Sequence, residues 1–337
     1  MAEGTKRHYC EPDYVRSICV IYIVCFWHMV SYTDISGFKN FRSQNIFEQI
    51  TYCVLACFMI ISGFFAYREY HGFKDVLKYY AGRFLRLWPL FAIAEIAMVF
   101  LGINDRQMLP YVLCGLGWLK KPYPLTLWFA GVIFLFWLLS PLLSMKKWQI
   151  SAGIAVTAEV IFVALSVFFT ADERLYFYWP FFAAGCFFGK LIREKDFRIT
   201  IDTLRGRIIT VAISLTCIAL SVLISFITDS KDFKTATIPA AVLFIAGWFL
   251  FFHVLHCKFT DTIARHITYA SMCMYLFHRV FFEILCRRAG FKVNSVGAWI
   301  LAVLLIFTAG YAIQFLYDFL TGLPKKVLNP KTEKELH

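Results

Sequence analysis

The sequence is poor in charge. Charged side chains make up only 17% of its 337 residues, whereas apolar side chains make up 60%. A soluble globular domain is nearer half apolar and a quarter charged. The composition therefore excludes a mainly soluble protein and indicates an integral membrane protein.

Several other features are missing. No internal repeat and no low-complexity tract is present, and none of the eleven cysteines forms a C-x-x-C pair, so we expect them to be reduced packing residues. No small-x-small cleavage site follows the first apolar run, which favours a retained anchor over a signal peptide. The net charge is +12, but the basic residues are spread over loops beside the apolar runs. Nucleic-acid binding would need a soluble basic face, so it is not expected.

The apolar runs are long enough to cross a bilayer. A hydrocarbon core of about 30 Å needs about 20 residues of helix. We therefore predict an all-α integral membrane protein, a bundle of about ten transmembrane helices. The expected spans are 14–33, 46–68, 83–103, 124–144, 150–170, 174–192, 206–228, 236–257, 267–287 and 295–320. The apolar segment 107–119 is too short to span and is expected to be interfacial or re-entrant.

The basic residues predict the topology. With the N-terminus inside, the segments on the cytoplasmic side hold about twice as many Lys and Arg as the outer ones, so both termini are expected to be cytoplasmic. The predicted organisation is a short N-terminal segment (1–13), one transmembrane domain (14–320) and a basic cytoplasmic tail (321–337). No fused soluble domain is expected.

Two ionisable residues lie in the first span. Arg16 is close to its cytoplasmic end, and His28 lies about 18 Å further along the helix. Ionisable residues inside a membrane are costly, so a functional role is the default hypothesis. The alternatives are that Arg16 extends its charge to the interface and that His28 is a hydrogen-bonded core residue.

Three more segments combine apolar context with polar groups. Arg83 and Arg86 are three residues apart, so on a helix they share one face, where two guanidinium groups suit a phosphate-rich ligand. Anchoring by the positive-inside rule is the alternative. The small Ser62-Gly63 step allows a close approach of another helix or of a slender ligand. Tyr275 and His278 are three residues apart in the expected span 267–287, and His278 would be a second intramembrane histidine. Together they favour an internal polar site.

One segment has the residue types of a metal site. His253, His256 and Cys257 form a short H-x-x-H-C cluster, but without a carboxylate or further cysteine it favours histidines that face lipid headgroups, so no metal is predicted. Three intramembrane acids are able to orient a histidine, and none can be assigned from sequence: Glu95, Glu159 and Glu283.

These motifs together resemble the membrane acyltransferase-3 family. They follow the family order and extend over most of the chain. The matching segments are Asp13-Tyr-Val-Arg16 with His28, Phe58-Met-Ile-Ile-Ser-Gly-Phe-Phe65, Arg83-Phe-Leu-Arg86 with Pro89, Leu127-Trp-Phe129, the step from Phe181 to Gly185, and Tyr275-Leu-Phe-His278.

The resemblance implies an activity. Members of the family move an acyl group from cytosolic acyl-CoA to an acceptor across the membrane, so acetyl-CoA is the expected donor substrate and no permanently bound cofactor is expected. The expected acceptor is a hydroxyl of a surface or exported glycan. By the same resemblance the protein lies in a bacterial plasma membrane and acts alone, as a homo-oligomer or with a separate acyl-accepting partner. A transporter or flippase for a glycan or lipid intermediate is the alternative.

The resemblance also implies residue roles. His28, with Arg16 and Asp13 in its motif, belongs to the catalytic group, and His28 is the expected general base. The acyl-CoA group consists of Arg83, Arg86 and Ser62, and Tyr275 and His278 form a further candidate site. A serine or tyrosine acyl relay stays open.

One feature departs from the family. Eleven residues, Ser17 to Trp27, separate Arg16 from His28, one more than is usual in the family. In a regular α-helix this spacing separates the two side chains by about 120° around the axis. A π-bulge absorbs one extra residue, so we predict a bulge or widened turn between Arg16 and His28. Asp318 only loosely matches the family's C-terminal pattern and is given no role.

Overall fold

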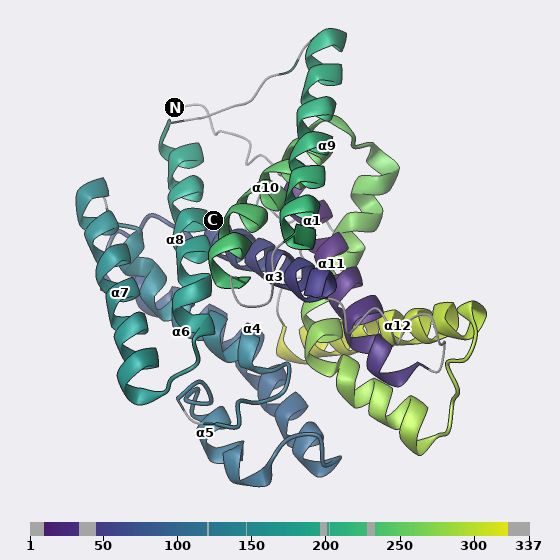
Figure 1. Ribbon diagram of the computed structural model, residues 1–337. Helices are drawn as coiled ribbons and strands as arrows, with labels where there is room; N and C mark the ends of the chain where they lie inside the picture. The colour runs from purple at the N-terminus through teal and green to yellow at the C-terminus, as the bar shows by residue number, and fades with distance from the viewer. Residues whose placement is uncertain are drawn as a thin grey trace. The chain divides into compact units, whose positions relative to one another are not determined.

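The computed structural model describes residues 10–33, 45–119, 121–145, 147–195, 201, 203–227 and 233–322. Within these ranges the chain is built of helices and one isolated bridge between Thr33 and Val293 (Figure 1). The chain ends, which carry most of the predicted N-terminal segment and most of the basic tail, lie outside the described residues.

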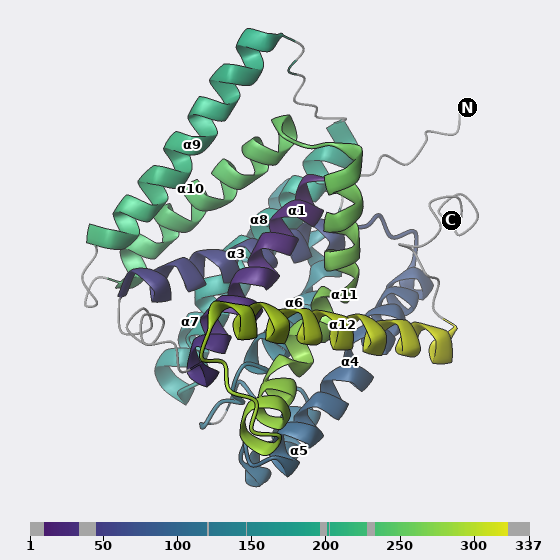
Figure 2. The same ribbon diagram turned by 90° about the vertical axis from the view of Figure 1, so that its right-hand side faces the viewer.

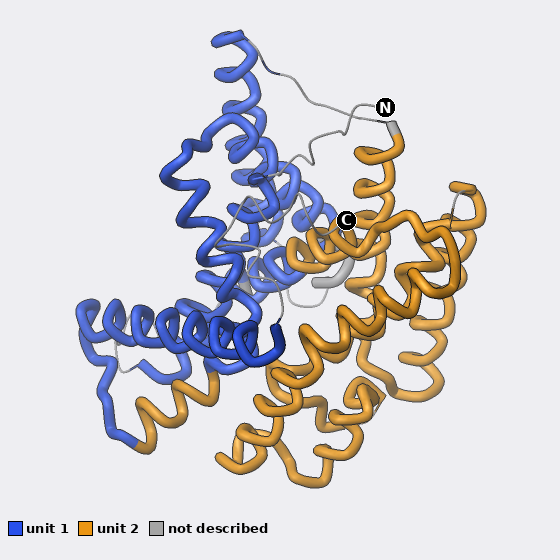
Figure 3. The backbone as a smooth tube through the Cα atoms, turned by 180° about the vertical axis from the view of Figure 1, so that it is seen from behind, with its two compact units in different colours: residues 1–55, 200–278, 289–337 blue, residues 56–199, 279–288 orange. Residues whose placement is uncertain are grey.

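The chain divides into two compact units (Figure 3). The first comprises residues 1–55, 200–278 and 289–337, and the second comprises residues 56–199 and 279–288. Two helices, α3 (Asn45–Ala66) and α11 (Lys258–Phe282), contribute residues to both.

The first unit opens with an unusual helix. An α-helical segment, α1 (Glu11–Val20), continues as a π-helix, η1 (Ile21–His28), and ends in a 3₁₀ turn, η2 (Met29–Tyr32). The other elements of this unit are the N-terminal half of α3, α9 (Leu204–Ile227), α10 (Phe233–Val254), most of α11, and α12 (Val296–Thr321).

Helices α9 and α10 lie side by side (Figure 2). Two buried serines of α9 donate hydrogen bonds to backbone carbonyls of α10, Ser214 to Gly247 at 2.8 Å and Ser221 to Ala240 at 2.7 Å. Small residues and serines are the usual means by which helices associate in lipid, because burial of apolar surface gives no advantage there.

The second unit contains α4 (Phe73–Phe100), α5 (Leu109–Leu113), α6 (Trp128–Leu143), α7 (Trp148–Phe169), α8 (Arg174–Lys195) and a π-helical turn, η4 (Glu283–Arg288). Its core is aromatic: Phe136 of α6 lies 5.2 Å from the Trp179 ring and 5.4 Å from the Phe182 ring of α8. The expected interfacial segment 107–119 forms a single 3₁₀ turn and the short α5, too short to cross a bilayer.

Among the described residues, seven helices are long and apolar enough to cross a membrane. They are Glu11–Tyr32, Ile46–Ala66, Trp148–Phe169, Arg174–Glu194, Leu204–Ile227, Thr237–Val254 and Val296–Thr321. The all-helical membrane fold is therefore confirmed, but the count of ten and the orientation of the termini are not. The other three expected spans do form helices. Helix α6 has only 16 residues, and the charged residues in the N-terminal parts of α4 and α11 shorten the apolar stretches of those helices.

The close approach of α3 and α8 depends on glycine. A Cβ atom at Gly63 would lie 2.0 Å from the Phe182 carbonyl oxygen, and one at Gly185 would lie 2.1 Å from the Ile60 carbonyl oxygen. The Ser62-Gly63 step and the Phe181–Gly185 step are thus two sides of one helix contact. Of the two interpretations of Ser62-Gly63, the structure supports helix packing.

Candidate functional site

The π-helix η1 confirms the predicted distortion between Arg16 and His28. A helix with i to i+5 hydrogen bonds turns less per residue than an α-helix, and eight residues of it bring Arg16 and His28 back to within roughly 30° of one another around the axis. Both side chains are half-buried. The Trp299 indole of α12 donates a hydrogen bond to the Cys25 carbonyl oxygen at 2.9 Å, so α12 supports the widened backbone.

The structure brings the two predicted intramembrane histidines together. The imidazole rings of His28 and His278 are stacked, with centroids 4.6 Å apart and planes inclined by only 4°. His278 is 0% exposed. The pairing joins residues 250 positions apart, the end of η1 and the last turns of α11, within the first unit.

A hydrogen bond determines the tautomer of His278. Its Nδ1 atom lies 2.7 Å from the Tyr275 carbonyl oxygen, which can only accept. Nδ1 therefore carries the proton, and in the neutral ring Nε2 is the basic nitrogen. Tyr275 is placed at the site through its main chain, and its ring centroid lies 5.9 Å from that of His278.

Other bonds fix the helices that carry this pair. The hydroxyls of Ser17 and Thr268 donate to the Asp13 carbonyl oxygen at 2.7 and 3.1 Å, so the main chain of Asp13 joins α1 to α11. At the other face of α11, the buried Asp318 accepts hydrogen bonds from Tyr269 at 2.7 Å and Gln314 at 3.0 Å. Asp318 thus positions α11 against α12, a role that its sequence pattern did not reveal.

The remaining candidates form a second group in the second unit. Arg83 is half-buried, donates to the Phe65 carbonyl oxygen at 2.8 Å, and lies 4.7 Å from the Trp137 ring. The Trp137 indole in turn donates to Ser62 Oγ at 3.0 Å. Ser62 therefore positions the Trp137 ring that the Arg83 guanidinium contacts.

Arg83 and Arg86 have different surroundings despite their spacing. Arg83 satisfies a carbonyl at the C-terminal end of α3, a favourable place for a cation, whereas Arg86 is exposed. A guanidinium has five N–H groups, so the bond to Phe65 leaves Arg83 further donors.

Of the three unassigned acids, two have clear partners in this unit. Glu95 accepts from Asn104 at 2.7 Å, and the Asn104 side chain accepts from the Leu125 amide, which ties the 101–125 segment to α4. Glu283 pairs with Arg287 at 3.2 Å. Glu159 is half-buried on α7.

Sequence reasoning missed Arg279. It follows His278 directly, is 8% exposed, and donates to the hydroxyl of Thr126, which has a positive φ of 67°. Thr126 precedes the Leu127-Trp-Phe129 motif. The signal available in the sequence was an arginine directly after the motif histidine. The interpretation of this segment rested only on Tyr275 and His278, which are three residues apart.

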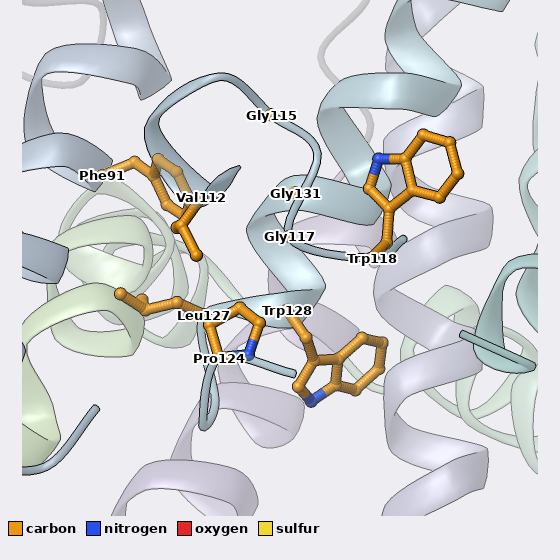
Figure 4. A pocket seen from close by; sticks show the side chains of 9 residues that line it. All are labelled: Phe91, Val112, Gly115, Gly117, Trp118, Pro124, Leu127, Trp128 and Gly131. Carbon is orange, nitrogen blue, oxygen red and sulfur yellow. The ribbon is translucent and has the colours of Figure 1, made fainter. Parts of the chain in front are cut away.

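The motif around Leu127 also borders a small hollow (Figure 4). Its walls include Trp118, Leu127, Trp128 and Gly131, and its lining contains no ionisable side chain. The hollow therefore offers apolar contact but no charged side chain for a phosphate.

The stacked histidines, one at the end of the π-helix η1 and one on α11, lie in a chain with several helices apolar enough to cross a membrane. The family model described as "Acyltransferase domain" matches residues 11–321, nearly the whole chain. The chain belongs to this acyltransferase-3 family and is a multi-pass membrane acyltransferase. Comparisons with curated proteins and with solved structures gave no match.

Proposed function

We propose that the protein transfers an acetyl or other short acyl group from cytosolic acyl-CoA to a hydroxyl of a surface or exported glycan. The observation that carries this proposal is the stacking of His28, at the end of the widened helix, on His278 of α11, in a chain that belongs to an acyltransferase family. A buried base beside an acyl donor is what such a transfer requires.

His28 is the proposed general base. It is half-buried, so an acceptor can reach it, whereas His278 is fully enclosed and is a positioning residue. His28 would take the proton of the acceptor hydroxyl as the oxygen attacks the thioester carbonyl, the C–S bond breaks, and the CoA thiolate leaves. Exclusion of water protects the thioester from hydrolysis.

Arg83 and Arg86 are the proposed CoA-phosphate ligands. Replacement of both by alanine is expected to raise the Kd for acetyl-CoA by roughly 30-fold or more, because two charge-assisted contacts are lost. Equilibrium binding to the full-length protein in detergent measures this. The double variant Arg205→Ala, Arg207→Ala removes two exposed arginines of α9 and should leave the Kd unchanged. Equal Kd values for wild type and the Arg83, Arg86 variant would remove these residues from the donor site.

A transporter or flippase remains the second candidate, because several apolar spans with buried polar groups suit it as well. The two functions differ in one chemical event. An acyltransferase cleaves the thioester, whereas a transporter moves its cargo and leaves acyl-CoA intact.

A further inference from the structure

Three separate elements converge at one end of the first unit. The start of α1, the end of α10 and the start of α11 lie together there (Figure 2). This end carries Cys10, His256 and Asp261, whose Sγ, ring nitrogen and carboxylate oxygen all lie within 4.8 Å of one another. Cys10 is 246 residues from His256 in sequence, so the cluster exists only in the folded chain.

We propose that Cys10, His256 and Asp261 bind a Zn²⁺ ion that fastens α1 to the α10–α11 connection. Thiolate, imidazole and carboxylate are the ligands that zinc uses in proteins. The sequence alone argued against a metal here because it showed His253, His256 and Cys257 without a carboxylate. The fold supplies that carboxylate from Asp261 and a thiol from Cys10.

The spacing of His256 and Asp261 suits a tetrahedral ion. Metal–ligand bonds of about 2.0–2.3 Å place neighbouring donor atoms roughly 3.3–3.8 Å apart. His256 Nδ1 lies 3.6 Å from Asp261 Oδ1, so this pair already has the required separation. The side chains of His256 and Asp261 are 42% and 21% exposed, so an ion can reach them from solvent.

The surroundings contain the supporting groups of a metal site. The Tyr14 hydroxyl bonds to Asp261 Oδ1 at 2.8 Å, which orients the carboxylate, as outer hydrogen bonds commonly do for metal ligands. The Cys10 thiol donates to Glu11 Oε2 at 3.8 Å. Glu11 also pairs with His253 Nδ1 at 2.8 Å, so a water molecule is left for the fourth position.

Such an ion would hold the helices of the histidine pair. Helix α1 leads into η1 and His28, and α11 carries His278. The cluster and the stacked rings are thus separated by about 25 Å along each helix. A Zn²⁺ ion bound at one end of α1 and α11 would limit movement of one helix along the other.

The test uses Zn²⁺ itself with the full-length protein in detergent. Competition with a chromophoric chelator gives the Kd, and elemental analysis gives the stoichiometry. We expect one equivalent of Zn²⁺ in the wild type, and a Kd raised about tenfold or more in Cys10→Ser and in His256→Ala. Cys114→Ser and His71→Ala remove an exposed thiol and an exposed imidazole elsewhere and should bind as the wild type does.

Replacement of Zn²⁺ by Co²⁺ in the wild type gives a measurement that does not depend on the folding of any variant. A thiolate ligand produces an intense near-ultraviolet charge-transfer band, which should be present in the wild type and in Cys114→Ser. Absence of this band from the wild type, absence of Zn²⁺ binding, or unchanged binding in folded His256→Ala would each overturn the proposal.

Discussion

Replacement of His28 with alanine is expected to lower the rate of acyl transfer by about 100- to 10,000-fold, the contribution typical of a positioned general base. Binding of acetyl-CoA should be retained, because the proposed phosphate ligands are elsewhere in the chain. The defect should therefore lie in the catalytic rate. The measurement is initial transfer rate, together with the Kd for acetyl-CoA, in purified full-length protein.

Two further variants give this experiment its controls. His71→Ala removes an exposed loop histidine and should leave the rate unchanged. His278→Ala should cost less than His28→Ala, roughly 10- to 100-fold, because His278 only positions the ring of His28. If His28→Ala retained full activity and His278→Ala lost it, His278 would be the base, through its Nε2 atom.

Replacement of Gly185 with valine is expected to disrupt the second unit. Even a Cβ at this position would meet the Ile60 carbonyl oxygen at 2.1 Å, and a backbone atom cannot turn away as a side chain can. Separation of α3 from α8 should cost about 3 kcal/mol or more, which would lower the thermal unfolding midpoint by roughly 6–12 °C.

Gly153 is the matched control. It lies on α7, and a Cβ there meets nothing within 4 Å. Gly153→Ala should leave the midpoint unchanged or raise it slightly, since alanine has the higher helix propensity. An unchanged thermal unfolding midpoint for Gly185→Val in the same detergent would contradict the close contact between α3 and α8.

The distortion of the first span was predictable because it follows from counting residues. One extra residue between Arg16 and His28 has to be absorbed, and the π-helix absorbs it. The number of spans was harder to predict. Helix α11 combines charged residues near Lys258 with a buried end at His278, and hydropathy cannot show which parts of such a helix meet lipid.

The contacts that define the sites could not be predicted from local patterns. The sequence indicates a role for His28 and for His278 separately, but their stacking joins segments 250 residues apart. Arg279 beside Thr126 and the Cys10 cluster depend on the same long-range folding. The spacing of Arg83 and Arg86 predicted one shared face, whereas the carbonyl of Phe65 and the ring of Trp137 give Arg83 an environment that Arg86 lacks.

The most direct test of the proposed acyl transfer is release of free CoA thiol from acetyl-CoA. The full-length protein is reconstituted in lipid vesicles with acetyl-CoA on one side and a high concentration of methyl glucoside, a simple hydroxyl acceptor, on the other. We predict protein-dependent thiol release, with matching acetylation of the sugar, and loss of both in His28→Ala. Movement of sugar across the membrane without thiol release, by protein shown to be folded, would contradict acyl transfer and support the transporter.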